Sequence, residues 1–286
     1  MLQFKAKTTE EYIPTNGIRL HTIRSGESGN PLIVLLHGFP EFWGCWKAQI
    51  DPLTEAGYQL IVPDQRGYNK SDHPRFVRSY NIDILARDIL GLIEYAGKSK
   101  AFIVGHDWGG AVAWHIGAHY AEKIEKIVVL NCPHPFVLKK FLKTDREQRH
   151  MSRYMFRFQT PFFPEWQIRR HNFAMLTRMF TRSSREGTFT EEDLEEYREV
   201  WRQKGGLRSI HWYRSSFRTK TEPIPVSIPT LLIWGTKDRF LKKEMAGESL
   251  SLCRQGRLEY IDEATHWIQR EEPERVNQLI LSFFKP

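Results

Sequence analysis

KAFIVGHDWGGAVAWHIGAH, residues 100–119, joins a strand, a tight turn and a helix without a break. The apolar run 101–104 is typical of a strand that is buried on both faces of a sheet. The turn GHDWGG follows, and the stretch from Ala111 onward continues as a helix. The polar residue at the centre of the turn, Asp107, is therefore expected at the carboxyl end of a buried strand.

The same alternation of strands and helices continues on both sides of this stretch. Further apolar runs that predict buried strands lie at 31–39, 58–67, 124–133, 228–238 and 256–267. Apolar residues at helical spacing predict helices over 79–97 and 273–286, and GIRLHTIRSG at 17–26 is typical of an early antiparallel strand pair. We therefore predict an α/β fold with a mostly parallel central sheet and helices on both faces.

The alternation stops in an inserted segment that is rich in arginine and aromatic residues. This segment has no apolar run typical of a buried strand, and it contains helical stretches such as TEEDLEEYREVWRQ at 190–203. That stretch begins with the capping-box pattern of Thr190 and Asp193. We therefore expect a core made of residues 1–134 and 226–286, with a helical cap of residues 135–225 inserted between them.

The net charge of +8 is confined to one part of the chain. Residues 138–222 hold 19 of the 42 Lys and Arg but only 11 of the 34 Asp and Glu, and the rest of the chain is balanced. A solvated, arginine-rich surface is one interpretation, and attraction of anionic ligands is another. Nucleic acid is not an expected partner, because the basic residues form no compact run and match no binding motif.

Cysteine usage and the lengths of the apolar runs bear on location and cofactors. No apolar run is long enough to span a bilayer, and the N-terminus has no apolar segment typical of a secretion signal. The three cysteines, Cys45, Cys132 and Cys253, form no metal-binding pattern. We therefore expect a cytoplasmic protein without a membrane span, a metal or an organic cofactor. A homodimer stays open.

Asp107 lies at the centre of a turn of the kind that presents a nucleophile. Gly105 and Gly109 stand two residues before and after it, where larger side chains are expected to collide with neighbouring strands. The turn also brings Asp107 to a helix N-terminus, whose dipole favours an anion. Taken alone, this motif leaves a second interpretation open, in which Asp107 only caps the helix.

Other polar groups of suitable kinds follow other predicted strands. Asp238 follows TLLIWG, and His266 follows the last strand in EATHW. The order Asp107, Asp238, His266 is nucleophile, acid and histidine, which is the order found in one large class of hydrolases. The backbone N–H groups of Phe39 and Trp108 are expected to form an oxyanion hole. Four such groups at strand ends favour a catalytic site over a helix cap.

Neighbouring polar residues have structural interpretations. His106 flanks Asp107, and its side chain is expected to point away from the site. Asp64 in DQRGY ends a strand and is expected to brace loops with Arg66.

Six stretches carry a resemblance to a known family: LLHGFPEFW, VPDQRGYNKSD, VGHDWGG, NCPHP, IWGTKD and EATHW. Along nearly its full length the chain resembles the epoxide hydrolases of the α/β-hydrolase fold, of the microbial and soluble type. The resemblance implies two cap tyrosines that protonate the epoxide oxygen, and similarity of the surrounding sequence points to Tyr154 and Tyr213. An aromatic side chain in the seam between cap and core is the alternative role for either.

A carboxylate nucleophile indicates reaction at a saturated carbon. Attack on an acyl carbon would leave a mixed anhydride, whereas attack on an sp³ carbon leaves an ordinary ester. Strained epoxides and alkyl halides both fit this chemistry, and the resemblance implies a small epoxide, apolar or aromatic, that forms an ester on Asp107. Water activated by His266 and Asp238 is expected to cleave that ester.

Two other functions stay open from the sequence. Haloalkane dehalogenases share the Asp–Trp elbow, and they need a second halide donor. The Phe39 side chain has no donor, but Trp166, Trp201 and Trp212 are available. Some relatives of this fold bind a ligand under the cap without catalysis.

Overall fold

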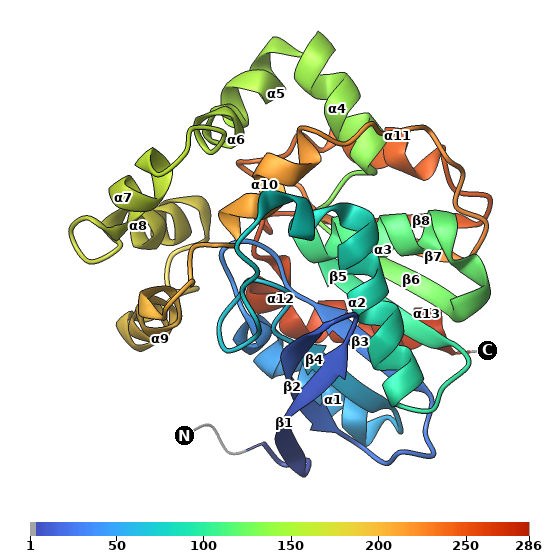
Figure 1. The fold of residues 1–286 in the computed structure, drawn as a ribbon. Coiled ribbons are helices and arrows are strands. Elements are labelled where there is room, and N and C mark those ends of the chain that lie inside the picture. Colours follow the sequence, from blue (N-terminus) through green and yellow to red (C-terminus); the bar gives the residue numbers. More distant parts are fainter. Residues whose placement is uncertain (1–3, 286) are drawn as a thin grey trace.

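The computed structural model describes residues 4–285, which build one eight-stranded sheet (Figure 1). The strands are β1 (Thr8–Thr15), β2 (Ile18–Ser25), β3 (Leu32–Leu36), β4 (Gln59–Pro63), β5 (Ala101–His106), β6 (Ile124–Leu130), β7 (Thr230–Gly235) and β8 (Gly256–Ile261). Their spatial order is β1-β2-β4-β3-β5-β6-β7-β8. β2 runs antiparallel to both neighbours, and the pairs from β4 to β8 are parallel. The predicted mostly parallel sheet with an early antiparallel pair is confirmed.

Helices cover both faces of the sheet, as expected. One face packs against α2 (Ile82–Tyr95) and α3 (Trp108–His119), and the other packs against α1 (Lys47–Glu55) and α13 (Pro273–Phe284). The core also contains α11 (Glu244–Leu250) and α12 (Ile268–Glu271), and three short 3-10 helices, η1 (Trp43–Trp46), η2 (Val77–Tyr80) and η3 (Ala121–Lys123).

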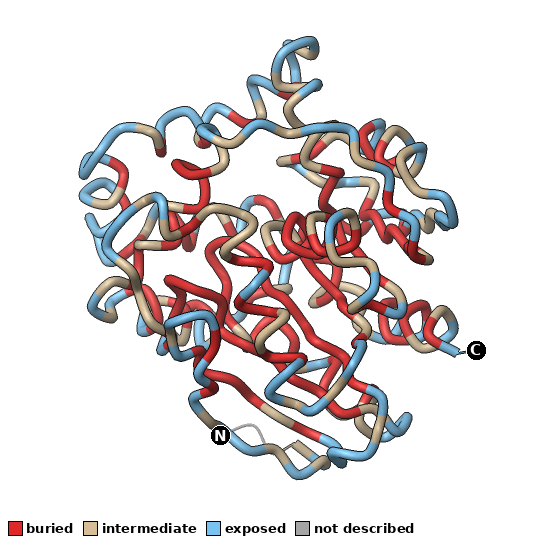
Figure 2. Tube along the Cα trace, turned by 45° about the vertical axis from the view of Figure 1, so that its right-hand side comes forward, coloured by how far each residue is buried: buried red, intermediate tan, exposed pale blue. Residues whose placement is uncertain are grey.

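The side chains of β3 show why helices pack on both faces of the sheet. Leu32, Val34 and Leu36 belong to the apolar cluster that contains α2 and α3. Ile33 and Leu35 belong to the cluster that contains α1 and α13, because successive side chains of a strand point to opposite faces. All five are buried, and Figure 2 shows buried residues concentrated in the strands and the helix faces against them.

Most of the strands are shorter than the stretches that predict them, so the last residues of these stretches lie in the loops after the strands. Because β3, β5, β7 and β8 run parallel, their carboxyl ends meet at the same edge of the sheet. The loops that follow these four strands carry Phe39, Asp107, Asp238 and His266 in that order. The sheet therefore brings together residues that lie up to 227 positions apart.

The segment between β6 and β7 is helical. Its helices are α4 (Pro135–Thr144), α5 (Arg146–Met151), α6 (Arg153–Arg157), α7 (Phe163–Arg169), α8 (Ala174–Ser183), α9 (Glu191–Arg202) and α10 (Ile210–Ser216). The predicted capping box of Thr190 and Asp193 at the start of α9 is confirmed. Figure 1 shows α5 to α9 outside the sheet, while α10 lies closer to it. The division into core and cap stays a prediction, and we call residues 135–225 the cap below.

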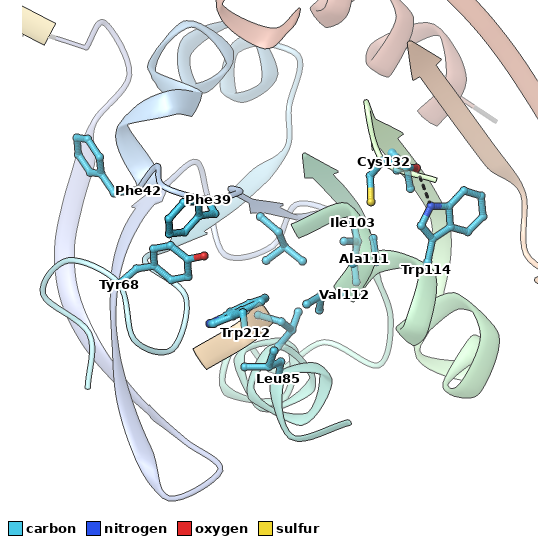
Figure 3. Close-up of a cluster of buried hydrophobic side chains, with 14 of the residues drawn as sticks. Phe39, Phe42, Tyr68, Leu85, Ile103, Ala111, Val112, Trp114, Cys132 and Trp212 are labelled. Atoms are coloured by element: carbon cyan, nitrogen blue, oxygen red, sulfur yellow. Dashed lines mark hydrogen bonds between the residues drawn. The ribbon is translucent and has the colours of Figure 1, made fainter. Parts of the chain in front are cut away.

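The cap and the sheet share one apolar cluster. The ring of Trp212, in α10, lies 5.5 Å from the ring of Tyr68, and Figure 3 shows both beside core side chains. The indole N–H groups of Trp201 and Trp212 donate to the carbonyl oxygens of Pro40 and Arg66, at 2.8 and 2.9 Å. These buried hydrogen bonds attach α9 and α10 to loops of the core.

One expected contact is wrong, since Arg66 does not pair with Asp64. Arg66 makes two charge-assisted hydrogen bonds of 2.7 and 2.6 Å to Asp88 of α2. Asp64 instead accepts hydrogen bonds from the Trp43 amide at 2.9 Å and the Asn69 side chain at 2.7 Å. Although Asp64 and Arg66 are only two residues apart in a loop, their side chains face different neighbours. The buried guanidinium of Arg66 therefore pairs with the carboxylate of Asp88 on the adjacent helix α2.

Among residues 4–285, none of the helices combines the length and the apolar character needed to cross a bilayer.

Candidate active site

Asp107 lies in the turn between β5 and α3 with φ 49° and ψ −118°, a backbone conformation that is strained for a residue with a side chain. The flanking glycines allow this turn. A Cβ on Gly105 would lie 2.3 Å from the carbonyl oxygen of Gly109, and a Cβ on Gly109 would lie 2.1 Å from that of Leu36. A Cβ on Gly38 would lie 2.4 Å from the Cβ of Asp107. The expected crowding is confirmed, and it comes from the start of α3 as well as from β3.

The amide of Phe39 contacts the carboxylate of Asp107, and the amide of Trp108 follows Asp107 directly in the chain. The amide of Phe39 donates a hydrogen bond to Oδ1 at 2.9 Å. Trp108 is the first residue of α3, so its amide has no partner inside the helix. Within residues 4–285 that amide also has no other hydrogen-bond acceptor. Of the two predicted oxyanion-hole residues, Phe39 therefore contacts Asp107 through a hydrogen bond, and Trp108 is its neighbour in the sequence.

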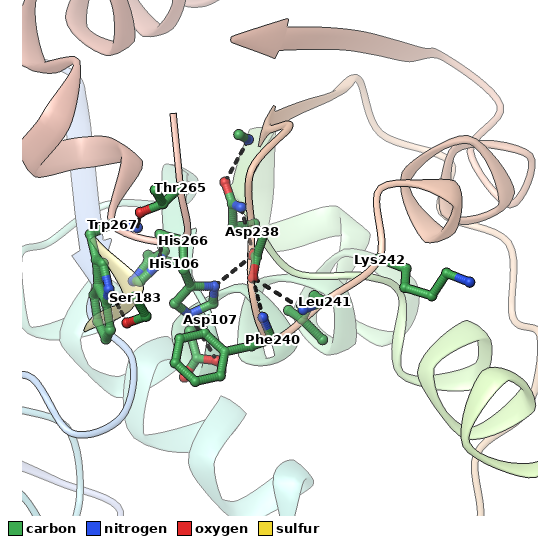
Figure 4. Close-up of polar contacts among 12 residues, drawn as sticks. His106, Asp107, Ser183, Asp238, Phe240, Leu241, Lys242, Thr265, His266 and Trp267 are labelled. Atoms are coloured by element: carbon green, nitrogen blue, oxygen red, sulfur yellow. Dashed lines mark hydrogen bonds and ion pairs between the residues drawn. The ribbon is translucent and has the colours of Figure 1, made fainter. Parts of the chain in front are cut away.

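His266 lies between Asp107 and Asp238 (Figure 4). Its Nδ1 is 2.7 Å from Oδ2 of Asp238, and its Nε2 is 3.6 Å from Oδ2 of Asp107. The other carboxylate oxygen of Asp238 accepts from the amides of Phe240 and Leu241, at 2.7 and 3.0 Å. Asp238 is thus held by its own loop, and it orients the ring of His266 so that Nε2 faces Asp107.

The charges of these groups are strongly coupled. Burial by itself lowers the pKa of His266, but the carboxylates of Asp238 and Asp107 outweigh burial and raise that pKa to about 10. Burial raises the pKa of Asp107, but the hydrogen bond and charge of His266 outweigh it and place that pKa below its usual range. At neutral pH the resting site therefore holds an ionised Asp107 that faces a protonated His266.

Two tyrosines face the same region from the cap. The ring centroids of Tyr154, in α6, and Tyr213, in α10, lie 5.8 Å apart. The ring of Tyr213 lies 4.9 Å from that of Trp108 and 5.2 Å from that of Phe39. Burial is the main cause that raises the pKa of both hydroxyls, and the nearby Asp107 carboxylate raises them further. Both hydroxyls are therefore proton donors at neutral pH.

Aromatic rings line the remaining sides. The ring of Phe240 lies 5.1 Å from that of His266 and 6.1 Å from that of Tyr154. Phe158 packs 5.6 Å from Phe39. Such apolar walls lower the local polarity, and this strengthens electrostatic interactions inside the site. Within residues 4–285, no group of three or more His, Cys, Asp or Glu is arranged to hold a metal ion.

A buried polar network behind the site is a feature that the sequence does not reveal. His106 points away from the site, as expected, and its Nε2 lies 2.8 Å from the carbonyl oxygen of His266. Its Nδ1 lies 3.2 Å from both the Glu41 carboxylate and the Gln269 amide nitrogen. Glu41 also accepts a hydrogen bond from the Tyr197 hydroxyl of α9 at 2.9 Å. This network anchors the loop that carries His266 and connects it to the cap.

Asn131 is a second residue that sequence reasoning misses. It donates to Oδ2 of Asp238 at 2.7 Å and accepts from the Gly235 amide at 3.0 Å. Its stretch NCPHP carries no local sign of this role, because the two partners lie 107 and 104 residues away along the chain.

Comparison with known proteins gives one consistent result. The model of the alpha/beta hydrolase fold family matches residues 31–273. Over 278 residues the chain is 45% identical to AB hydrolase superfamily protein YfhM of Bacillus subtilis (strain 168), covering 96% of this chain and 97% of that protein. It is 39% identical to epoxide hydrolase 4 of Homo sapiens, over 96% of this chain and 77% of the human protein. The crystal structure of the Bacillus megaterium epoxide hydrolase in complex with an inhibitor matches with a TM-score of 0.88 at 31% identity, covering 96% and 99% of the two chains.

Proposed function

The chain belongs to the alpha/beta hydrolase fold family and is one of its epoxide hydrolases, and we propose that it forms vicinal diols through an ester on Asp107. The observation that carries this proposal is the position of the Asp107 carboxylate. It lies in the strained turn, 2.9 Å from the Phe39 amide and 3.6 Å from Nε2 of His266. A helix cap needs neither contact, whereas a nucleophile that must later be released by water needs both.

In the first step the Asp107 carboxylate attacks one oxirane carbon from the side opposite to the C–O bond that breaks. A new C–O bond makes the ester, and the electron pair of the broken bond goes to the epoxide oxygen. The hydroxyls of Tyr154 and Tyr213 hold that oxygen, and one of them protonates it. The tyrosine then recovers a proton from the protonated His266 by way of solvent, and this transfer leaves His266 neutral.

In the second step the neutral His266, oriented by Asp238, takes a proton from water as general base. The hydroxide attacks the carboxyl carbon of the ester, and the amides of Phe39 and Trp108 hold the developing oxyanion. One such donor contributes ~3 kcal/mol to the transition state. Collapse breaks the bond between the carboxyl carbon and the diol oxygen, and this oxygen takes the second proton of the water. The diol leaves, and the site again holds the Asp107 carboxylate and the His266 imidazolium. The resting pair thus supplies one proton to the epoxide oxygen and regains one from water.

The contacts of the tryptophans disfavour dehalogenation. The indole N–H groups of Trp201 and Trp212 already donate to carbonyl oxygens of the core. Trp166 is 54% exposed and lies under Arg170. None of the three is positioned as a second halide donor beside Trp108. A role in ligand binding without catalysis does not require the contact between His266 and Asp107.

Single-turnover hydrolysis of styrene oxide in heavy-oxygen water tests the ester. We expect the first diol to carry ordinary oxygen and the label to appear in the Asp107 peptide, as seen by mass spectrometry. Label that enters the diol directly would overturn the proposal. 1-Bromobutane serves as the parallel substrate, and release of bromide in place of diol would support dehalogenation.

Two variants complete this experiment. His266→Gln is expected to form the ester and stall, which intact-mass measurement detects as an adduct. Asp107→Asn is expected to give no diol and no adduct, and Asp262→Asn is its matched control, because Asp262 is an exposed acid near His266 in sequence. Loss of turnover in the control, or retained turnover in Asp107→Asn, would contradict the assignment of the nucleophile.

A further inference from the structure

The cap exposes large aromatic side chains over residues 153–170, a stretch that contains α6 and α7 and lies outside the sheet (Figure 1). Phe162 is 83% exposed, Trp166 54% and Phe163 51%. The rings of Phe163 and Trp166 lie 5.8 Å apart. Exposed aromatic side chains that gather on one surface are typical of an interaction site, because their contact with water is unfavourable. We call the exposed face of residues 153–170 the cap patch.

Buried polar contacts hold this segment in place. The guanidinium of Arg214, in α10, donates to the carbonyl oxygens of Phe158 and Thr160 at 2.8 and 2.7 Å. It also pairs with Glu165 of α7 at 2.5 Å. Between these anchors Phe162 has φ 62°, in the left-handed region that a bulky residue rarely adopts. The fold therefore fixes the backbone that presents the aromatic side chains to solvent.

Positive charge surrounds these aromatic side chains. Residues 152–182 contain six arginines and a single acidic residue, Glu165, whose carboxylate is already paired. Arg153, Arg157 and Arg169 are exposed. In the part of the chain that the structure describes, residues 4–285, none of these three guanidinium groups lies within 4.0 Å of a carboxylate oxygen. The cap patch is therefore complementary to an anionic surface.

A second copy of the chain and a lipid bilayer are the two partners to compare. In a two-fold dimer the same patch faces itself, so the arginines of one copy would approach those of the other and repel them. An anionic bilayer offers phosphates to the guanidinium groups and a hydrocarbon boundary to the rings. Trp166, with the guanidinium of Arg170 4.8 Å from its ring centroid, has the paired apolar and basic character of membrane-interface residues.

We propose that the cap patch binds the surface of a bilayer that contains anionic phospholipid. Phe162, Phe163 and Trp166 enter the boundary between headgroups and acyl chains. Arg157 and Arg169 lie at the level of the lipid phosphates and pair with them. Neither interaction is sufficient alone, since stable attachment to a membrane surface needs both an apolar and an electrostatic contribution. The inference does not depend on the proposed function, because binding needs no turnover.

Co-sedimentation of the full chain with lipid vesicles tests the proposal. One set of vesicles contains phosphatidylcholine alone, and in the other set half of the lipid is phosphatidylglycerol. We expect binding to the anionic vesicles to be at least about tenfold tighter. It should weaken in about 1 M salt, where the Debye length is only ~3 Å. Equal binding to both sets, or binding to neither, would overturn the inference.

The variant Arg157→Gln/Arg169→Gln tests the electrostatic contribution. Each basic side chain near an anionic surface contributes about fivefold, so we expect roughly twenty-five-fold weaker binding to the anionic vesicles. The matched control is Arg254→Gln/Arg275→Gln, which changes two exposed arginines of the core by the same total charge. An equal loss in the control would contradict the inference, because it would indicate an effect of net charge rather than of the cap patch.

The variant Phe162→Ser/Phe163→Ser tests the apolar contribution and should bind the anionic vesicles about tenfold more weakly. Its control is Tyr95→Ser/Tyr260→Ser, which removes two exposed aromatic side chains of the core and should keep wild-type binding. Equal binding of the phenylalanine variant and the wild type would overturn the inference.

Sedimentation velocity without vesicles examines the second copy as the partner. We expect the wild type and the phenylalanine variant to sediment alike. A dimer that only the phenylalanine variant dissociates would overturn the inference and assign the cap patch to self-association. Circular dichroism should show wild-type thermal unfolding in every variant, and the arginine pair decides the outcome if the phenylalanine variant unfolds early.

Discussion

The carboxylates of Asp238 and Asp107 together raise the proton affinity of His266, and Asp107→Asn tests the part that comes from Asp107. The variant keeps the shape of the side chain but removes the charge, as esterification does in the proposed reaction. With Nε2 of His266 3.6 Å from the carboxylate, the lost attraction is about 4.6 kcal/mol at an effective dielectric constant of ~20. This energy corresponds to a roughly thousandfold lower proton affinity. We expect the pKa of His266, about 10 in the wild type, to fall into the neutral range in the variant.

The charge state of Asp107 determines whether His266 can act as a base at neutral pH. In the resting enzyme His266 stays protonated below about pH 10 and cannot accept a proton from water. Once Asp107 is neutral, His266 loses its proton near neutral pH and becomes a competent base. Formation of the ester therefore converts His266 into the base that is needed to hydrolyse the ester.

Nuclear magnetic resonance of protein labelled with ¹⁵N-histidine measures this pKa. The signal of His266 is assigned by its disappearance in His266→Gln. Asp262→Asn serves as the control, because it also removes one carboxylate but from an exposed position, and it should leave the titration of His266 unchanged. The reasoning is refuted if His266 is already neutral at pH 7 in the wild type, or if it titrates at the same pH in Asp107→Asn and the wild type.

Three further outcomes are expected. Tyr213→Phe and Tyr154→Phe should slow ester formation in rapid-mixing experiments by at least about 10²-fold, the usual contribution of an acid catalyst, and unchanged rates would assign the proton to another group. The rate of ester hydrolysis should rise with pH through the neutral range as His266 loses its proton, while ester formation stays flat, and a flat hydrolysis rate would contradict the base assignment. Asp88→Asn should lower the free energy of unfolding, measured with urea, by ~3 kcal/mol, because the buried Arg66 loses its ionic partner. The control Asp262→Asn changes an exposed residue and should leave the free energy of unfolding unchanged. Equal stability of Asp88→Asn and the wild type would contradict the expected loss.

The strands and the Asp107 turn are predictable because their causes are local. A strand buried on both faces must be apolar at nearly every position, and β3, with all five residues buried, meets that condition. The turn at Asp107 needs glycine at Gly105 and Gly109, since any larger residue would meet backbone atoms there. Each condition is visible within five consecutive residues, 32–36 for β3 and 105–109 for the turn.

The contacts that tune the site are not predictable in this way because their partners are remote. Arg66 is drawn to Asp88 although Asp64 is two residues away. Glu41 has no local partner, and its polar contacts come from His106 of β5, Tyr197 of α9 and Gln269 of α12. A sequence pattern reports that such residues follow a strand, but it does not report which charged group the folded chain places opposite them.

Periodicity, glycine spacing and the order of single polar residues after strands are sufficient to predict that Asp107, Asp238 and His266 share one edge of an α/β sheet. The physical reason is that parallel strands end together, whatever the length of chain between them. The proton held by His266, and the amides and Asn131 that hold Asp238, emerge only after folding. Electrostatic energy depends on distance in space, and distance along the chain carries almost no information about it.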